Sequence, residues 1–174
     1  DDAMLALFSA RDADVDTVCE AADELRRRQV GDAVSYVINR NINYTNVCQY
    51  SCRFCAFSKG GGEVASGRAA YDIDAEELHR RVEEAAALGA TEVCLQGGIH
   101  PDYTGQTYLD ILRTVKEAAP AIHVHAFSPL EIDQGASTLN LPLDQYLSML
   151  KEAGLDSLPG TAAEVLDERV RDIL

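Results

Sequence analysis

The sequence predicts an α/β fold in which a helical lead-in precedes the first four βα units of a partial, TIM-like barrel. Two observations predict it. Four apolar segments of strand length alternate with segments whose apolar residues recur at helical spacing. Each strand segment also ends in a polar or glycine-rich stretch, and such alternation is typical of parallel strands joined by right-handed crossovers. We expect residues 1–33 to form a helical extension and residues 34–174 to form the front part of the barrel of a longer protein.

The elements of the first half follow from apolar spacing and capping residues. Residues 14–28 carry a helical apolar stripe, and residues 33–45 are predicted to form the first strand, which leads directly into a cysteine-rich loop. Asp74 and Glu77 are spaced as a capping pair at the start of the next helix, which ends at Gly89.

The second half repeats the alternation between strand and helix. The predicted elements are a strand at 90–98, a helix at 107–120, a strand at 121–129, a helix at 142–154, a short strand at 155–160 and a helix from Ala162 onward. Pro142 suits the first turn of its helix because proline lacks the N–H that this position leaves unpaired. In barrels of this kind the active site lies at the carboxyl ends of the strands, so we expect functional residues there.

The amino-acid composition limits which binding partners and which cellular compartment we expect for the protein. The net charge of −14, from 29 acidic against 15 basic residues, argues against nucleic acid, because phosphate contacts need clustered Lys and Arg. No run approaches the roughly 18 apolar residues of a membrane span, and the N-terminus lacks the pattern of a secretory leader. The five cysteines are not spaced as a disulfide framework, which favours the cytoplasm. Cys19 and Cys94 lie in apolar patterns and are predicted to be buried.

Three cysteines, Cys48, Cys52 and Cys55, stand in one short loop with the spacing C-x3-C-x2-C. A structural zinc site would need a fourth ligand from a distant histidine, and a disulfide would leave one thiol over. An iron–sulfur cluster fits better, because three thiolates can hold three irons of a cubane and leave the fourth iron open to a small molecule. A zinc site and a plain electron-transfer centre remain the alternatives.

This loop at the end of the first strand resembles the hallmark of the radical S-adenosylmethionine (SAM) superfamily. The resemblance implies a [4Fe–4S] cluster held by the three cysteines, with SAM as the second cofactor. It further implies that an electron from the cluster cleaves SAM and that the resulting 5′-deoxyadenosyl radical removes a hydrogen atom from the substrate. The protein then supplies position and shielding.

Other cofactor contacts are implied by the same resemblance. Phe54 matches the aromatic position near the adenine of SAM. Gln96, Gly97 and Gly98 end the second strand where the superfamily binds the methionine amino group. The usual acidic residue of that motif is Ile99 here, so a plain strand-to-helix turn is the alternative.

Polar residues after the later strands are the candidates for substrate contact. His123 and His125 alternate with apolar residues, so both imidazoles point to one side of their strand, either into the barrel or into a core. Ser128 and Glu131 follow that strand as candidates for the substrate, and Glu164 follows the fourth strand as a candidate for the cofactor. Helix capping is the alternative role for these three residues.

Within the superfamily, the chain resembles the branch of deazaflavin (FO) synthases and futalosine enzymes. The segments that carry this resemblance are NRNINYTNVC, CRFCAF, QGGIHP, HVHAFSPLEI and PGTAAEVLDERVR. Residues 159–164 favour the tyrosine-using component of FO synthase. That family joins the 4-hydroxybenzyl group of L-tyrosine to 5-amino-6-(D-ribitylamino)uracil, which implies a second FO synthase component and a one-electron donor as partners. A futalosine-type substrate and a non-catalytic metal or electron-transfer module are the alternatives.

Overall fold

The computed structural model of the chain divides into two units. The structure describes residues 2–50, 52–53, 55–58, 69–160 and 165–173. The first unit comprises residues 1–36 and the second residues 37–174, whereas the sequence places the boundary between residues 33 and 34.

The first unit consists of two helices, α1 (Asp2–Phe8) and α2 (Ala13–Val30), of which the second follows the predicted stripe. Acidic residues occupy the first turn of α2 and arginines its last turn, which complements the helix dipole. Glu24 accepts hydrogen bonds from the guanidinium groups of Arg27 and Arg28 on the next turn.

Cys19 does not occupy the buried position that its apolar pattern predicts. Its thiol is exposed, and none of the described residues of the first unit is buried. The prediction was wrong because the apolar stripe of α2 finds no partner within its own unit.

None of the described helices is both long and apolar enough to cross a membrane.

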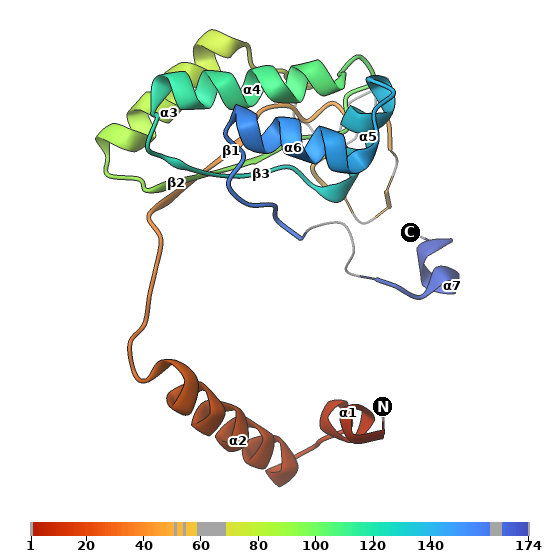
Figure 1. Ribbon diagram of the computed structural model, residues 1–174. Coiled ribbons are helices and arrows are strands. Elements are labelled where there is room, and N and C mark those ends of the chain that lie inside the picture. The colour runs from red at the N-terminus through yellow and green to blue at the C-terminus, as the bar shows by residue number, and fades with distance from the viewer. Residues whose placement is uncertain (1, 51, 54, 59–68, 161–164, 174) are drawn as a thin grey trace. The chain divides into compact units, whose positions relative to one another are not determined.

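The second unit is built on a parallel sheet with the strand order β1-β2-β3 (Figure 1). The strands are β1 (Asn39–Asn43), β2 (Glu92–Gln96) and β3 (His123–Ala126), each shorter than predicted. Instead of a full fourth strand, the structure shows a single parallel bridge between His125 and Ser157. The α/β fold with successive parallel strands is confirmed.

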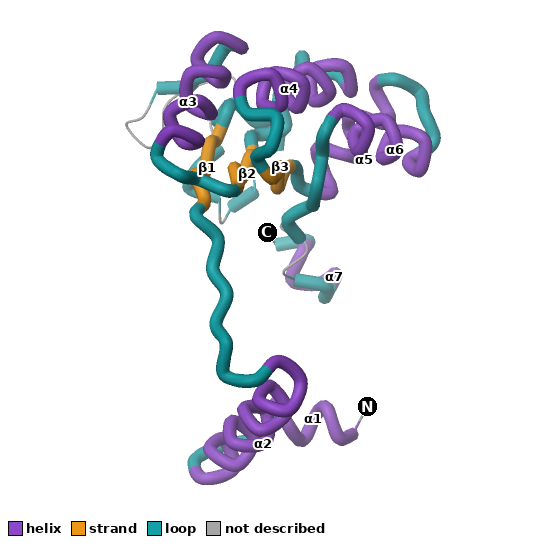
Figure 2. Tube along the Cα trace, turned by 60° about the vertical axis from the view of Figure 1, so that its left-hand side comes forward, coloured by secondary structure: helices purple, strands orange, loops and turns teal. Residues whose placement is uncertain are grey.

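Four helices cover one face of this sheet, as Figures 1 and 2 show. They are α3 (Ala75–Ala87), α4 (Gly105–Ala118), α5 (Pro129–Thr138) and α6 (Leu143–Ala153). A last short helix, α7, spans Glu168–Arg171.

Two helices differ from the sequence prediction. α5 was not predicted as a separate helix, although Ser128 and Glu131 form a reciprocal capping box around its proline start. Within the helix predicted from Ala162, the described residues 165–167 are not helical and a helix, α7, starts at Glu168. Residues 161–164 lie outside the described residues.

The core lies between the sheet and its helices. Val93, Leu95 and Val124 point to the covered face and are fully buried against helix residues such as Val82 and Leu112. Burying a side chain of this size contributes about 1.5–3 kcal/mol. The alternate strand residues point to the opposite face and are polar apart from one cysteine, so the sheet has one apolar and one polar side.

Asp156 ties the start of β3 to the end of α4. One carboxylate oxygen accepts hydrogen bonds from Val124 N at 2.8 Å and from Lys116 Nζ at 2.9 Å. Partial burial acts to raise the pKa of Asp156, but the Val124 amide and the Lys116 ammonium outweigh it and hold this pKa below its usual value.

We expect Asp156→Ala to lower the free energy of unfolding by about 1 kcal/mol at neutral pH, because the pair is partly exposed and screened. Because the folded-state pKa of Asp156 is lowered, this residue contributes stability at pH values above the unfolded-state pKa of 3.8. The contribution is lost as the pH falls through the folded-state pKa. The difference between variant and wild type should therefore shrink in urea titrations at pH values below about 4. Asp133→Ala, at an exposed position of α5, is the control; an equal loss there would contradict this role of Asp156.

Candidate active site

The loop that carries Cys48, Cys52 and Cys55 (the cysteine loop) meets the turn at Gly97 and Gly98 (the glycine turn) where β1 and β2 end. Gly98 N donates to Thr45 O at 2.9 Å, and Gln49 N donates to Ile99 O at 2.8 Å. Because β1 and β2 are neighbours in the sheet, the two segments that follow them run side by side. The predicted cysteine loop and the predicted cofactor turn therefore lie next to each other.

The two glycines of the turn are required by close packing. A Cβ atom at Gly98 would lie 2.2 Å from Val47 O and 2.9 Å from Cys48 Cβ. A Cβ atom at Gly97 would lie 2.4 Å from the Tyr44 ring. The absence of side chains lets the backbone of the turn touch the start of the cysteine loop.

We expect Gly98→Ala to displace the cysteine loop, because its methyl group would overlap a backbone carbonyl that cannot rotate away. Overpacking of this kind costs about 1–3 kcal/mol. Gly160→Ala is the matched control, since a Cβ atom there meets nothing within 4 Å. Urea unfolding and iron content after reconstitution measure the effect. Equal stability and iron content in the two variants would contradict the close contact.

The three sulfur atoms differ in exposure and in their amide partners. Cys48 is half-buried, whereas Cys52 and Cys55 are exposed. Ile99 N donates to Cys48 Sγ at 3.3 Å, and Ser58 N donates to Cys55 Sγ at 3.4 Å. Amide donors stabilise the negative charge of a thiolate, the form that binds metal.

The cysteine loop fits an iron–sulfur cluster by its donor set. All three thiols are unpaired, and two of them already receive backbone N–H groups. Across the described ranges, no three His, Cys, Asp or Glu side chains converge on a single ion. A cubane does not require such convergence, because each cysteine binds a different iron.

Phe54, predicted to lie near the adenine, falls outside the described residues.

Thr45 and Asn46 brace the cysteine loop against the segment that precedes α3. Asn46 Oδ1 accepts from Tyr71 N at 2.7 Å, and its Nδ2 donates to Ala69 O at 3.1 Å. Thr45 Oγ1 donates to Tyr71 O at 2.9 Å. Both side chains are almost fully buried, so their role is to shape the loop.

Glu131 occupies the centre of the three strand ends with a fully buried side chain. Its carboxylate accepts hydrogen bonds from the Tyr44 hydroxyl, from Gly97 N at 3.2 Å and from Ser128 N at 2.5 Å. Burial raises the pKa of Glu131, and these hydrogen bonds counteract part of that rise. Burial, followed by the charge of Glu131, raises the pKa of Tyr44 in turn. Ser128 is the N-cap of α5. The predicted substrate contacts of Ser128 and Glu131 stay predictions.

His123 and His125 lie on the polar face of the sheet. Their rings share one partner, because Ser157 Oγ lies 2.7 Å from His123 Nε2 and 2.7 Å from His125 Nδ1. Glu92 Oε2 lies 3.8 Å from His123 Nε2. Cys94, predicted to be buried, is half-buried on this same face because its side chain alternates with the buried Val93.

The sequence-based residues therefore separate into two groups. The first lies at the carboxyl ends of the strands and includes the half-buried Gln96 as the last residue of β2, the glycine turn, Ser128 and Glu131. The second is the pair of histidines. Glu164 lies outside the described residues. Sequence reasoning did not assign Tyr44 as a partner of Glu131 or Ser157 as a partner of the histidines, although Tyr44 directly follows β1 and Ser157 lies in the predicted fourth strand segment.

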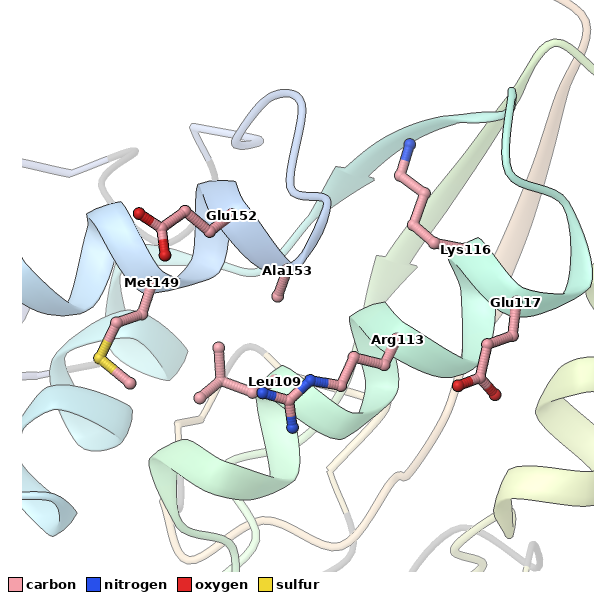
Figure 3. A pocket seen from close by; sticks show the side chains of 7 residues that line it. All are labelled: Leu109, Arg113, Lys116, Glu117, Met149, Glu152 and Ala153. Atoms are coloured by element: carbon pink, nitrogen blue, oxygen red, sulfur yellow. The ribbon is translucent and has the colours of Figure 1, made fainter.

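A separate cavity of about 430 Å³ lies between α4 and α6, away from the strand ends (Figure 3). Its lining mixes Leu109 and Met149 with charged groups of both signs. Arg113 is paired with Asp110 of its own helix.

The fold and the cysteine loop define a class of protein. The family model described as Radical SAM superfamily matches residues 42–174, and the chain belongs to this superfamily. Its members use a [4Fe–4S] cluster together with SAM. The fold is shared with methylornithine synthase (PylB), with a TM-score of 0.62 at 18% identity over 87% of this chain and 40% of that one. The hydrogenase maturase HydG gives a TM-score of 0.59 at 15% identity over 87% of this chain and 40% of its own.

Curated relatives of this chain belong to a narrower group within the superfamily. The chain is 50% identical to FO synthase of Streptomyces coelicolor and 52% identical to FO synthase of Nocardia farcinica, in both cases over all 174 residues. It is 48% identical over 153 residues to 5-amino-6-(D-ribitylamino)uracil–L-tyrosine 4-hydroxyphenyl transferase of Methanocaldococcus jannaschii, which covers 86% of this chain. The chain spans 20% of the length of the two FO synthases and 42% of the length of the transferase.

Proposed function

We propose that the protein containing this chain is a radical SAM transferase of deazaflavin biosynthesis. It joins the 4-hydroxybenzyl group of L-tyrosine to 5-amino-6-(D-ribitylamino)uracil. The observation that carries this proposal is the 48% identity to a transferase named for these two substrates, together with the matches of the whole chain to FO synthases. A second FO synthase component and a one-electron donor are the proposed partners, and the cytoplasm is the proposed location.

Roles for individual residues follow from their positions. Cys48, Cys52 and Cys55 hold the [4Fe–4S] cluster. When bound, the cluster and SAM supply the carbon-centred radical that starts the reaction. Gln96, Gly97 and Gly98 are proposed to bind the amino group of SAM, and the contact of Gly98 with Val47 and Cys48 at the start of the cysteine loop supports this role.

The remaining cofactor contacts are assigned from the family pattern. Phe54 lies near the adenine of SAM, and Glu164 contacts the cofactor from the end of the fourth strand segment. Ser128, Glu131, His123 and His125 are proposed to act on the substrate side, either in direct contact or by orienting the groups that touch it.

A reconstitution experiment tests the function. The full gene product is loaded with iron and sulfide without oxygen, then incubated with SAM, a reductant, L-tyrosine and the diaminouracil. We expect 5′-deoxyadenosine and a coupled product whose mass is that of the diaminouracil plus a 4-hydroxybenzyl group, less the hydrogen it replaces. Formation of a futalosine product from a futalosine-type substrate, with no coupling of tyrosine, would overturn the proposal.

A further inference from the structure

The uncovered face of the sheet is polar on all three strands, which is unusual for a parallel sheet. Parallel strands generally bury both faces and read as continuous apolar runs. Here the covered face is apolar, whereas the opposite face presents these side chains: Asn39, Asn41, Asn43, Glu92, Cys94, Gln96, His123 and His125. We call this set the polar face.

The position of the polar face in the fold identifies it as the inside of the barrel. In (β/α) barrels the helices cover the outside, and α3–α6 all cover the other side of this sheet (Figure 2). Barrel interiors are ordinarily filled with branched aliphatic residues in packed layers. Amides and imidazoles in those positions are not suited to a dry core, because each leaves hydrogen-bonding groups that need partners.

The side chains of the polar face are arranged in rows across the strands. Asn41, Cys94 and His125 are register partners on β1, β2 and β3, and the bridge to Ser157 extends this row by one residue. Neighbouring strands lie about 4.8 Å apart, so the row offers hydrogen-bonding groups at intervals of a few ångströms. A chain of hydroxyl groups can follow such a row.

Ser157 orders the two imidazoles. Its hydroxyl oxygen lies 2.7 Å from His123 Nε2 and 2.7 Å from His125 Nδ1, so it holds one nitrogen of each ring in place, and the tautomers of the rings decide which group donates. The second nitrogen of each imidazole has no hydrogen-bond partner among the residues that the structure describes. These nitrogens are available to a ligand.

The charge of the polar face restricts the class of ligand. Arg40 points to the helical side, where it lies 3.8 Å from Glu84. The strands therefore place no Lys or Arg among the described residues of the polar face, and its one carboxylate is Glu92, hydrogen-bonded to Asn39 at 2.6 Å. Phosphate and carboxylate groups would find no cation here, whereas neutral hydroxyls match groups that both donate and accept.

We propose that the polar face binds the ribityl chain of the diaminouracil, a neutral polyol, and that Ser157 is the residue that positions His123 and His125 for it. This inference rests on the proposed function and names where the acceptor substrate lies. L-Tyrosine, which carries a carboxylate and an ammonium group, binds elsewhere.

The first test uses wild-type protein and needs no variant. Binding of 5-amino-6-(D-ribitylamino)uracil to the reconstituted full gene product is measured by calorimetry, without turnover. It is compared with an analogue whose ribityl chain is replaced by an unsubstituted pentyl chain, and with the ribityl 5′-phosphate. We expect the dissociation constant to rise about tenfold or more for each, because hydroxyl contacts are lost or a phosphate meets no cation. Equal binding of the pentyl analogue, or tighter binding of the phosphate, would overturn the proposal.

The second test uses Ser157→Ala with Ser148→Ala as the matched control. Ser148 is exposed on α6 and bonds only to Asp144 O of its own helix among the contacts described. We expect Ser157→Ala to weaken binding of the diaminouracil about tenfold, to leave binding of L-tyrosine within about twofold, and to keep the melting temperature of the control. Weakened tyrosine binding with unchanged diaminouracil binding would refute the assignment.

Failure of the proposed function is distinguishable from failure of this inference. The function fails if wild-type protein yields no coupled product, whatever the binding results. The inference fails if wild-type protein couples the two substrates but does not discriminate the ribityl chain from its pentyl analogue.

Discussion

Replacing Cys48 with alanine in the full gene product is expected to abolish formation of 5′-deoxyadenosine. Cys48 is the half-buried cysteine of the three, its sulfur already accepts the Ile99 amide, and its Cβ packs beside the glycine turn. Changing a residue that only orients a metal ligand lowers metal affinity or activity up to roughly 100-fold. Removing a cluster ligand itself should lower the yield of 5′-deoxyadenosine by more than that. Cys52→Ala and Cys55→Ala should have the same effect, since a cluster held by two thiolates is no longer anchored at three corners.

Cys19→Ala is the matched control for these variants. Its thiol is exposed on α2, a helix of the other unit, and it is not one of the three cysteines of the C-x3-C-x2-C pattern. Iron and sulfide content, the visible absorption of the cluster and the yield of 5′-deoxyadenosine should all match wild type. Full iron content and undiminished turnover in Cys48→Ala would remove the cluster from the cysteine loop.

The cysteine loop could be predicted because its signal is local. Three cysteines within eight residues indicate their chemistry before any fold is known. The sheet could be predicted for a related reason, since apolar residues alternate in β2 and β3 with a period of two. The adjacency of the cysteine loop and the glycine turn then follows from neighbouring parallel strands ending at one edge.

Contacts between distant segments could not be predicted in the same way. Tyr44 and Glu131 are 87 positions apart, and their contact depends on β1 and β3 both flanking β2. The contact of Ser157 with both histidines depends on the bridge that follows β3. Cys19 shows the opposite error, because an apolar stripe indicates that a helix needs a partner but not that the partner lies in the same unit.

Glu131→Ala is expected to have the largest effect on stability. It removes the one carboxylate that accepts from the Tyr44 hydroxyl, Gly97 N and Ser128 N, in a fully buried position. Each buried donor left without an acceptor costs about 1–3 kcal/mol, and the three share one site, so we expect a loss of about 3–5 kcal/mol in urea unfolding. Iron content should fall as well, because Tyr44 and Gly97 border the cysteine loop.

Glu131→Gln separates the charge of this residue from its shape. Burial raises the pKa of Glu131 above its ordinary value of 4.5, so its contribution to stability is present at low pH and is lost as the pH rises through the folded-state pKa. This sign is opposite to that of Asp156. The stability of wild type relative to Glu131→Gln should therefore decrease as the pH rises above 4.5. Glu117→Gln, exposed on α4, should show no such trend; the same slope in both variants would mean that the buried carboxylate is not its source.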